Sequence, residues 1–250
     1  MLGDRAAWLA DFLAERTIQT NEVQRSWMLL PCFLEVSRVT GADAFDLIEL
    51  GSSAGLNLVW DRYRYRYANG DWGPAEGALE LSGEERGPVP RRLLGLRPGV
   101  RRRIGIEREP IDVTNDEDAL LLKAFVWADQ HARLDRLDRA IEALRRDPPE
   151  LVRGDFVELL PDVLASTDGD GLTLVFQTAS LGYGPPNARK LVTAMLDEAG
   201  RNRRLAYVSS GRPLDRSDHY YGLWVTLWPG GEARVVANAG FHGHWLEWVT

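Results

Sequence analysis

The sequence predicts an α/β fold whose doubly wound, mostly parallel sheet closes with an antiparallel hairpin. Segments with helical periodicity alternate about five times with continuous apolar strands, which is typical of a parallel sheet covered on both faces. Near the C-terminus, two strand-like runs flank a Pro-Gly-Gly turn, and this pattern predicts the closing hairpin. We find no internal repeat and no convincing linker, so we expect residues 1–250 to form one domain.

The first 44 residues predict a helical segment that lies over the ligand site. Apolar residues at helical spacing indicate helices over residues 5–16 and 23–39. The polar stretch between them offers Thr20 and Asn21 as N-capping residues. An apolar run over residues 45–50 predicts the first strand, and a helix is expected to start within residues 56–60.

Residues 62–100 predict an inserted hairpin and loop outside the main sheet. The run RYRYRY at residues 62–67 alternates with period two, which indicates a strand with its tyrosines packed inward. Alternating tyrosines and arginines could also stack single-stranded nucleic acid. The net charge of −7 disfavours that alternative, because a nucleic-acid binder must offset phosphate charge.

The rest of the chain continues the alternation of strands and helices. Thr114 and Asn115 precede three acidic residues, which favours a helix start at that point. The apolar stripe of this helical region continues to Leu144. The further predicted elements are strands over 103–107, 151–153, 173–177 and 205–208, a helix over 185–199, and the hairpin strands 223–228 and 233–239.

Composition narrows the class of protein. The single cysteine, Cys32, excludes an intramolecular disulfide and a thiolate metal cluster. No histidine and carboxylate pattern has metal-binding spacing, so we expect no metal. The apolar runs are of strand length and no secretory leader is visible, so we expect a cytoplasmic protein without membrane contact. The arginine clusters at 91–103 and 201–204 indicate solvated surface.

The turn after the first strand is the first candidate site. Ligands of open α/β sheets bind beyond the carboxyl ends of the strands. There, Gly51 and Gly55 bracket Ser52 and Ser53 in a small-residue turn that could admit a ligand to the backbone. The turn matches neither the GxGxxG fingerprint nor a P-loop. It does spell Gly-x-Ser-x-Gly, so a serine hydrolase with Ser53 as nucleophile and His242 as its histidine is an alternative.

Polar residues also follow the later strands. Glu107 could accept hydrogen bonds from two ribose hydroxyls, or it could simply pair with Arg108. Asp155 could accept from an exocyclic amine while Phe156 covers a purine face, although Asp155 could equally cap a helix. Glu49 suits a ligand that carries an amino group better than one that carries a diphosphate.

Together these features resemble the class I S-adenosylmethionine-dependent methyltransferases, whose Rossmann-like, seven-stranded sheet ends in a hairpin. Their motif acid-x-Gly-x-x-x-Gly is matched by residues 49–55, and their ribose-binding and adenine-contacting acids follow the second and third strands. The resemblance implies S-adenosylmethionine as cofactor and a small molecule as methyl acceptor. It implies as cofactor-binding residues Glu49, Gly51, Ser52, Ser53, Gly55, Asn57, Glu107, Asp155, Phe156 and Gln177.

A second resemblance covers nearly the whole chain. The segments QTNEVQRS (19–26), ELGSSAGLNLVWDRYRYRY (49–67), GIEREPIDV (105–113) and HGHWLEW (242–248) are similar to an uncharacterised bacterial family, domain of unknown function 2332. Members usually carry aspartate at the position of Glu107, whose longer side chain could still reach a ribose. This family brings no established reaction, so it supports the fold and leaves the function open.

A few residues could do more than bind the cofactor. Glu22 and His242 are the candidates for catalysis, and His242 could serve as a general base near neutral pH. The segment after residue 177 lacks the Asn/Asp-Pro-Pro-aromatic sequence of amine methyltransferases, which disfavours methylation of a nucleobase or glutamine. A binding protein without turnover remains an alternative to a methyltransferase. The candidate substrate-binding residues are Asn21, Glu22, Tyr183, His242 and Trp245.

Overall fold

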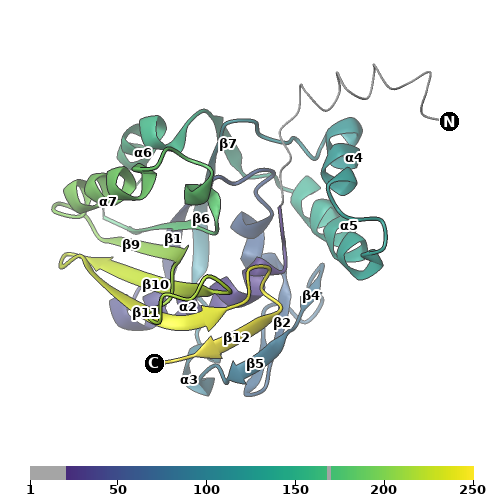
Figure 1. The fold of residues 1–250 in the computed structure, drawn as a ribbon, viewed down its shortest axis with the longest axis horizontal. Helices are drawn as coiled ribbons and strands as arrows, with labels where there is room; N and C mark the ends of the chain where they lie inside the picture. The colour runs from purple at the N-terminus through teal and green to yellow at the C-terminus, as the bar shows by residue number, and fades with distance from the viewer. Residues whose placement is uncertain (1–20, 168–169) are drawn as a thin grey trace.

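A nine-stranded sheet forms the centre of the protein (Figure 1). The computed structural model describes residues 21–167 and 170–250. The strand order is β5-β12-β11-β10-β9-β8-β1-β6-β7. The strands are β1 (Ala44–Leu50), β5 (Glu84–Gly87), β6 (Gly99–Glu107), β7 (Glu150–Arg153), β8 (Leu172–Gln177), β9 (Leu205–Gly211), β10 (Tyr221–Trp228), β11 (Glu232–Ala239) and β12 (Trp245–Trp248).

The parallel half of the sheet is doubly wound around β1. From β1 the chain moves outward through β6 to β7, then returns to the other side of β1 and continues through β8 to β9. Strands β7, β6, β1, β8 and β9 pair in parallel, whereas β10 and β11 form an antiparallel hairpin against β9. The predicted mixed α/β fold with a mostly parallel sheet is therefore confirmed.

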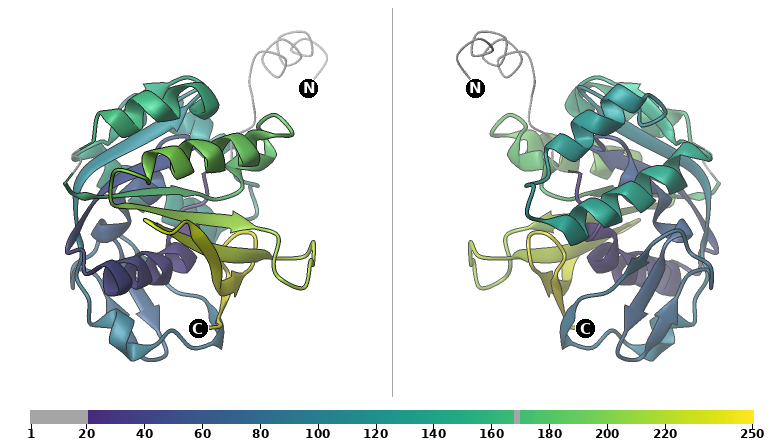
Figure 2. Two further views of the ribbon diagram at one scale, coloured as in Figure 1. Left: turned by 90° about the vertical axis from the view of Figure 1, so that its left-hand side faces the viewer. Right: turned by 90° about the vertical axis from the view of Figure 1, so that its right-hand side faces the viewer.

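Helices cover both faces of this sheet, as the two edge-on views show (Figure 2). One face packs against α6 (Phe156–Ala165) and α7 (Ala188–Ala199), through residues such as Ile48 and Leu196. The other packs against α2 (Arg25–Thr40) and α5 (His131–Arg145), through residues such as Leu47 and Phe33. Because side chains alternate along a strand, Ile48 and Leu47 of β1 enter different cores, and Glu49 lies on the α2 face.

The insertion differs in part from the sequence prediction. Its predicted hairpin is present in a small sheet of β2 (Arg64–Tyr67), β3 (Gly70–Trp72) and β4 (Glu80–Leu81), and Tyr63, Tyr65 and Tyr67 are buried as expected. Its β5, however, joins the main sheet by pairing in parallel with β12, and α3 (Arg91–Leu94) follows. The main sheet therefore extends two strands beyond the predicted closing hairpin.

The element after the glycine turn is a short 3₁₀ helix, η2 (Leu56–Arg62), and this corrects the expected ordinary helix. Val59 has non-helical backbone angles within it. The hydroxyl of Tyr63 donates to the Leu56 carbonyl at 2.8 Å, and that of Tyr65 donates to the Trp60 carbonyl at 2.7 Å. The Trp60 carbonyl also accepts the Tyr63 N–H at 3.2 Å, so the tyrosine hydroxyls add side-chain donors to the carbonyls of this helix.

The structure tests only part of the predictions for the first 44 residues. Helix α2 corresponds to the expected helix 23–39, but its N-cap position is Gln24, so Asn21 does not cap it. The expected helix 5–16 and the candidate cap Thr20 lie outside the described residues. The remaining helical elements of the described residues are α4 (Asp116–Ala124), which Asn115 caps as expected, and η3 (Ser180–Gly182). Within the described ranges, none of the helices is long and apolar enough to cross a membrane.

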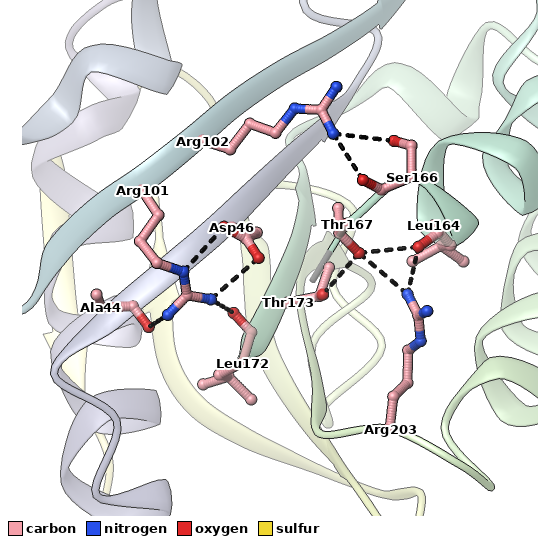
Figure 3. Close-up of polar contacts among 10 residues, drawn as sticks. All are labelled: Ala44, Asp46, Arg101, Arg102, Leu164, Ser166, Thr167, Leu172, Thr173 and Arg203. Atoms are coloured by element: carbon pink, nitrogen blue, oxygen red, sulfur yellow. Dashed lines mark hydrogen bonds and ion pairs between the residues drawn. The ribbon is translucent and has the colours of Figure 1, made fainter. Parts of the chain in front are cut away.

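Arginines close the amino ends of the parallel strands, opposite the predicted ligand edge (Figure 3). Arg101 donates to both carboxylate oxygens of Asp46, at 3.1 and 3.0 Å. Arg102 donates to the Ser166 carbonyl at 2.7 Å, and Arg203 donates to the Thr167 hydroxyl at 3.0 Å. These members of the basic clusters therefore hold strand ends and connections together, in addition to reaching solvent.

Candidate functional site

A pocket of about 230 Å³ opens at the carboxyl ends of β1, β6 and β8. This edge includes the point between β1 and β8 where the direction of strand addition reverses, which is where open α/β sheets bind ligands. Its lining residues are Asn21, Arg25, Glu49, Gly51, Ser52, Ser53, Asn57, Ile106, Glu107, Arg108, Glu109, Phe156, Thr178, Ala179, Ser180 and Tyr183. The structure thus brings together nine of the predicted site residues, namely Asn21, Glu49, Gly51, Ser52, Ser53, Asn57, Glu107, Phe156 and Tyr183.

The glycine turn is held between its two neighbouring strands. The Gly51 N–H donates to the Ile106 carbonyl at 2.9 Å, and the Ser180 hydroxyl donates to the Leu50 carbonyl at 2.5 Å. Gly51 has a φ of 72°, and a Cβ atom there would lie 2.4 Å from Cβ of Ser180. Only glycine satisfies both the left-handed backbone and this close approach.

We expect Gly51→Ala to destabilise the protein more than Gly41→Ala, a matched control. Both glycines have a left-handed φ, 72° and 68°, so both substitutions incur about 1 kcal/mol of backbone strain. A Cβ at Gly41 would meet nothing within 4 Å, whereas one at Gly51 collides with Ser180. The collision adds about 1–3 kcal/mol. Chemical denaturation measures the difference, and equal losses of stability would contradict the close approach of these two loops.

Glu107 ties the turn to β6. Its carboxylate accepts the Ser53 N–H at 2.8 Å and the Glu109 N–H at 3.3 Å. Ser53 has a φ of 52°, an uncommon backbone conformation for a residue with a side chain. A carboxylate has about four acceptor sites, so these two bonds leave Glu107 capacity for ligand hydroxyls.

Glu49 is a buried acid at the base of the pocket. Burial raises its pKa well above the ordinary value, Glu107 raises it further, and a hydrogen bond from Asn57 and the charge of Arg25 oppose the shift. Asn57 is itself oriented by the Ser26 hydroxyl, which donates to its Oδ1 at 2.8 Å. Glu49 Oε2 has no hydrogen-bond partner within the described part of the chain.

Two hydroxyls near Glu49 are also without partners. The Oγ atoms of Ser52 and Ser53 are buried, and no described residue bonds to either one. Buried polar atoms normally have partners, so unpartnered ones in a pocket wall indicate where a ligand or water would bind. Asn21, the first described residue, also contacts this turn, because its Nδ2 donates to the Ser52 carbonyl at 3.1 Å.

Three predicted cofactor-binding residues lie outside the pocket wall. Asp155 caps α6 by accepting the Val157 N–H at 2.8 Å, and it pairs with Arg108. Gln177 is fully buried and donates to the Ser210 carbonyl at 2.8 Å. Gly55, with a φ of 83°, has a structural role in the turn.

The candidates Glu22, His242 and Trp245 also lie outside it. Glu22 forms an ion pair with Arg133 at 2.6 Å. His242 reaches solvent, yet partial burial and the charge of Arg25 lower its pKa. Trp245 packs against Tyr220 and lies beneath the guanidinium of Arg86, 4.1 Å from the ring centroid.

Sequence reasoning missed Arg25 and gave no role to three residues of the loop after β8. Thr178, Ala179 and Ser180 of this loop contribute to the wall, and they lie between Gln177 and Tyr183, which were both predicted site residues. Arg25 lies in the segment QTNEVQRS, whose similarity to a family was noted without a role for this residue. Either position could have been found by following every strand end and every shared segment to its polar residues.

The fold and the site define an α/β protein with a pocket at the switch point of its sheet. Within the described ranges, no group of three or more His, Cys, Asp and Glu side chains could hold a metal ion. The chain belongs to the family described as uncharacterized protein conserved in bacteria (DUF2332), whose model matches residues 1–248. This confirms the second resemblance drawn from the sequence. A search of curated proteins finds no match to the chain.

Proposed function

We propose that this protein binds S-adenosylmethionine and transfers its methyl group to a small molecule. The observation that carries the proposal is the pair of acids, Glu49 and Glu107, at the ends of adjacent strands on the pocket wall. Their strand neighbours Ile48, Leu50 and Ile106 all enter the core of the opposite face, so both acids lie on the same face of the sheet. The glycine turn lines the same pocket. An amine-bearing nucleoside presents the cation and the hydroxyls that such acids bind, and no phosphate-binding motif competes for it.

The residues of the wall fit this cofactor. The ribose hydroxyls would donate to Glu107, and the cationic end would lie toward Glu49, whose Oε2 lacks a partner within the described part of the chain. Phe156 offers an aromatic surface to the adenine, and the exposed Tyr183 lies at the rim. S-adenosylmethionine supplies the electrophilic methyl group when bound.

The chain's own contribution to transfer would be alignment of the acceptor with the methyl group. Such alignment alone lowers the barrier of a bimolecular step considerably. Transfer releases S-adenosylhomocysteine, and a neutral acceptor would pass its proton to solvent or to a base, for which Glu22 and His242 stay predictions. A binding protein without turnover is the alternative, and it is favoured by the position of both of these residues outside the pocket wall.

A serine hydrolase is the second alternative, and one observation favours it. Ser53 has the left-handed backbone of a nucleophile at a strained turn. Against it, the Ser53 hydroxyl has no partner within the described residues, and none of the pocket's lining residues is a histidine. A nucleophilic serine needs a base within hydrogen-bonding reach.

Calorimetric titration with S-adenosylmethionine, S-adenosylhomocysteine and NAD tests the proposal. We expect heat with both sulfur nucleosides and none with NAD. If neither S-adenosylmethionine nor S-adenosylhomocysteine gives heat, the cofactor assignment is overturned. Covalent labelling of Ser53 by a fluorophosphonate, lost in Ser53→Ala, would instead support the hydrolase.

A further inference from the structure

Arg25 places a buried positive charge in the wall of the pocket. The residue is 8% exposed, and its Nε donates to the Phe241 carbonyl at 3.0 Å. Within the described residues, no hydrogen bond or ion pair engages its two terminal nitrogens. Burial lowers its pKa, but a guanidinium stays charged in proteins. The terminal nitrogens are not among the fully buried atoms that lack partners, so they are open to the pocket, where an anionic ligand can bind a guanidinium that is otherwise buried.

The acids near Arg25 do not fill this role. Glu22 is already bonded to Arg133 and to the Gln24 N–H. Arg25 lowers the pKa of Glu49 but forms no ion pair with it, and burial, the larger effect, raises that pKa and favours the neutral carboxylic acid. Glu22 raises the pKa of Arg25 through its charge, but no described carboxylate forms an ion pair with the guanidinium, which faces the pocket.

Two segments far apart in the sequence hold Arg25 in place. Gln24 Nε2 donates to the carbonyls of Ser82 and Gly243, at 3.0 and 3.2 Å. Gly243 approaches so closely that a Cβ atom there would lie 2.6 Å from the Gln24 carbonyl oxygen. The loop before β12 thus fixes the start of α2, and the Phe241 carbonyl orients the guanidinium. Such fixing lowers the entropy lost when a ligand binds.

We propose that Arg25 binds a carboxylate of the small molecule in the pocket, so the ligand is a carboxylic acid. A guanidinium with two unengaged terminal nitrogens matches the planar, two-oxygen geometry of a carboxylate. The inference rests on the proposed function for the identity of the nucleoside, but not for the chemistry of the Arg25 contact. The carboxylate belongs either to the amino-acid end of the sulfur nucleoside or to the methyl acceptor.

The first experiment compares S-adenosylhomocysteine with its decarboxylated analogue, which keeps the amine. If the nucleoside supplies the carboxylate, the wild-type protein binds the decarboxylated analogue about tenfold more weakly or worse. Arg25→Gln then loses the same factor for S-adenosylhomocysteine and nothing for the analogue. Arg25→Lys recovers part of the loss, because it keeps the charge without the fork. Arg139→Gln, which removes an exposed charge from α5, is the matched control and changes neither affinity.

The second experiment addresses the acceptor. NMR titration of the protein saturated with S-adenosylhomocysteine compares benzoate with benzamide, its uncharged isostere. If the acceptor supplies the carboxylate, benzoate binds to the wild-type protein, benzamide does not, and Arg25→Gln abolishes the preference. An Arg25→Gln protein that folds and shows no change in either experiment would overturn the proposal.

Failure of the proposed function gives a different result. If no sulfur nucleoside binds the wild-type protein, the benzoate and benzamide titrations are made on the protein alone. A preference for benzoate that depends on Arg25 then supports the carboxylate site without the cofactor. The lack of such a preference overturns the carboxylate site as well.

Discussion

Glu107→Ala is expected to weaken binding of S-adenosylhomocysteine by a factor of about 100 or more. A hydrogen bond to a charged group contributes about 1.5–3 kcal/mol, and two ribose hydroxyls would lose such a partner together. The substitution also removes the acceptor of the Ser53 N–H, which holds the glycine turn in its left-handed conformation. We therefore expect a smaller loss of stability of about 1–2 kcal/mol alongside the loss of affinity.

Conservative variants separate these two effects. Glu107→Gln keeps an oxygen that can accept the Ser53 N–H, so it should restore the stability but not the full affinity. Glu107→Asp shortens the side chain and should retain part of the affinity. Glu158→Ala removes an exposed acid from α6 and is the control for a change in net charge. Calorimetry and chemical denaturation provide the two measurements. Unchanged affinity in a folded Glu107→Ala protein would mean that the ribose binds elsewhere.

The parallel half of the sheet could be predicted because its signals are local. Strand β8 is a largely apolar run that ends in Gln177, and each of its residues is buried. Strand β7 ends where Gly154 and Asp155 interrupt it, and Asp155 caps the next helix as one of the sequence interpretations held. Apolar runs bounded by glycine, proline and capping residues are informative because the competing structures are disfavoured within the same few residues.

The pairing of β5 with β12 could not be predicted in this way. It joins Glu84–Gly87 to Trp245–Trp248, and neither four-residue strand shows an apolar run long enough to identify its partner. The 3₁₀ form of η2 was missed for a related reason. Two of its carbonyls accept the hydroxyls of Tyr63 and Tyr65. The inward direction of these side chains was predicted, but their hydroxyl partners depend on the folded geometry.

The candidate site also contains residues that local sequence predicts and residues that depend on long-range contacts. Residues next to the first two strand ends, such as Glu49 and Glu107, were identified because the carboxyl ends of parallel strands share one edge. Arg25 was missed because its place in the wall depends on contacts with Phe241 and, through Gln24, with Gly243. Contacts between residues this far apart in the sequence leave no periodic pattern in it.

Glu49→Gln is expected to make the protein more stable at neutral pH while weakening its binding of a cationic ligand. Burial is the main cause of the raised pKa of Glu49, and Glu107 adds to it, whereas Arg25 and Asn57 oppose it. The folded protein therefore holds a proton that the unfolded chain releases near its ordinary pKa of 4.5. Wild-type stability must fall as pH rises from that value to the folded pKa, by about 1.4 kcal/mol for each unit of the shift. Glutamine does not titrate, so Glu49→Gln escapes this loss.

A bound cation shifts the protonation equilibrium of Glu49 in the opposite direction, because it favours the ionised carboxylate. Affinity of the wild-type protein for S-adenosylmethionine should rise with pH up to the pKa of Glu49 in the unliganded protein, and binding should release a proton there. Glu49→Gln should bind more weakly and lose this part of the pH dependence. Denaturation at several pH values measures the first effect, and calorimetry in buffers of different ionisation enthalpy measures the second. If the stabilities of the wild-type and Glu49→Gln proteins change with pH in parallel above pH 4.5, Glu49 does not have the raised pKa. The opposite signs of the two effects would mean that the acid is retained at a cost in stability because the ligand requires it.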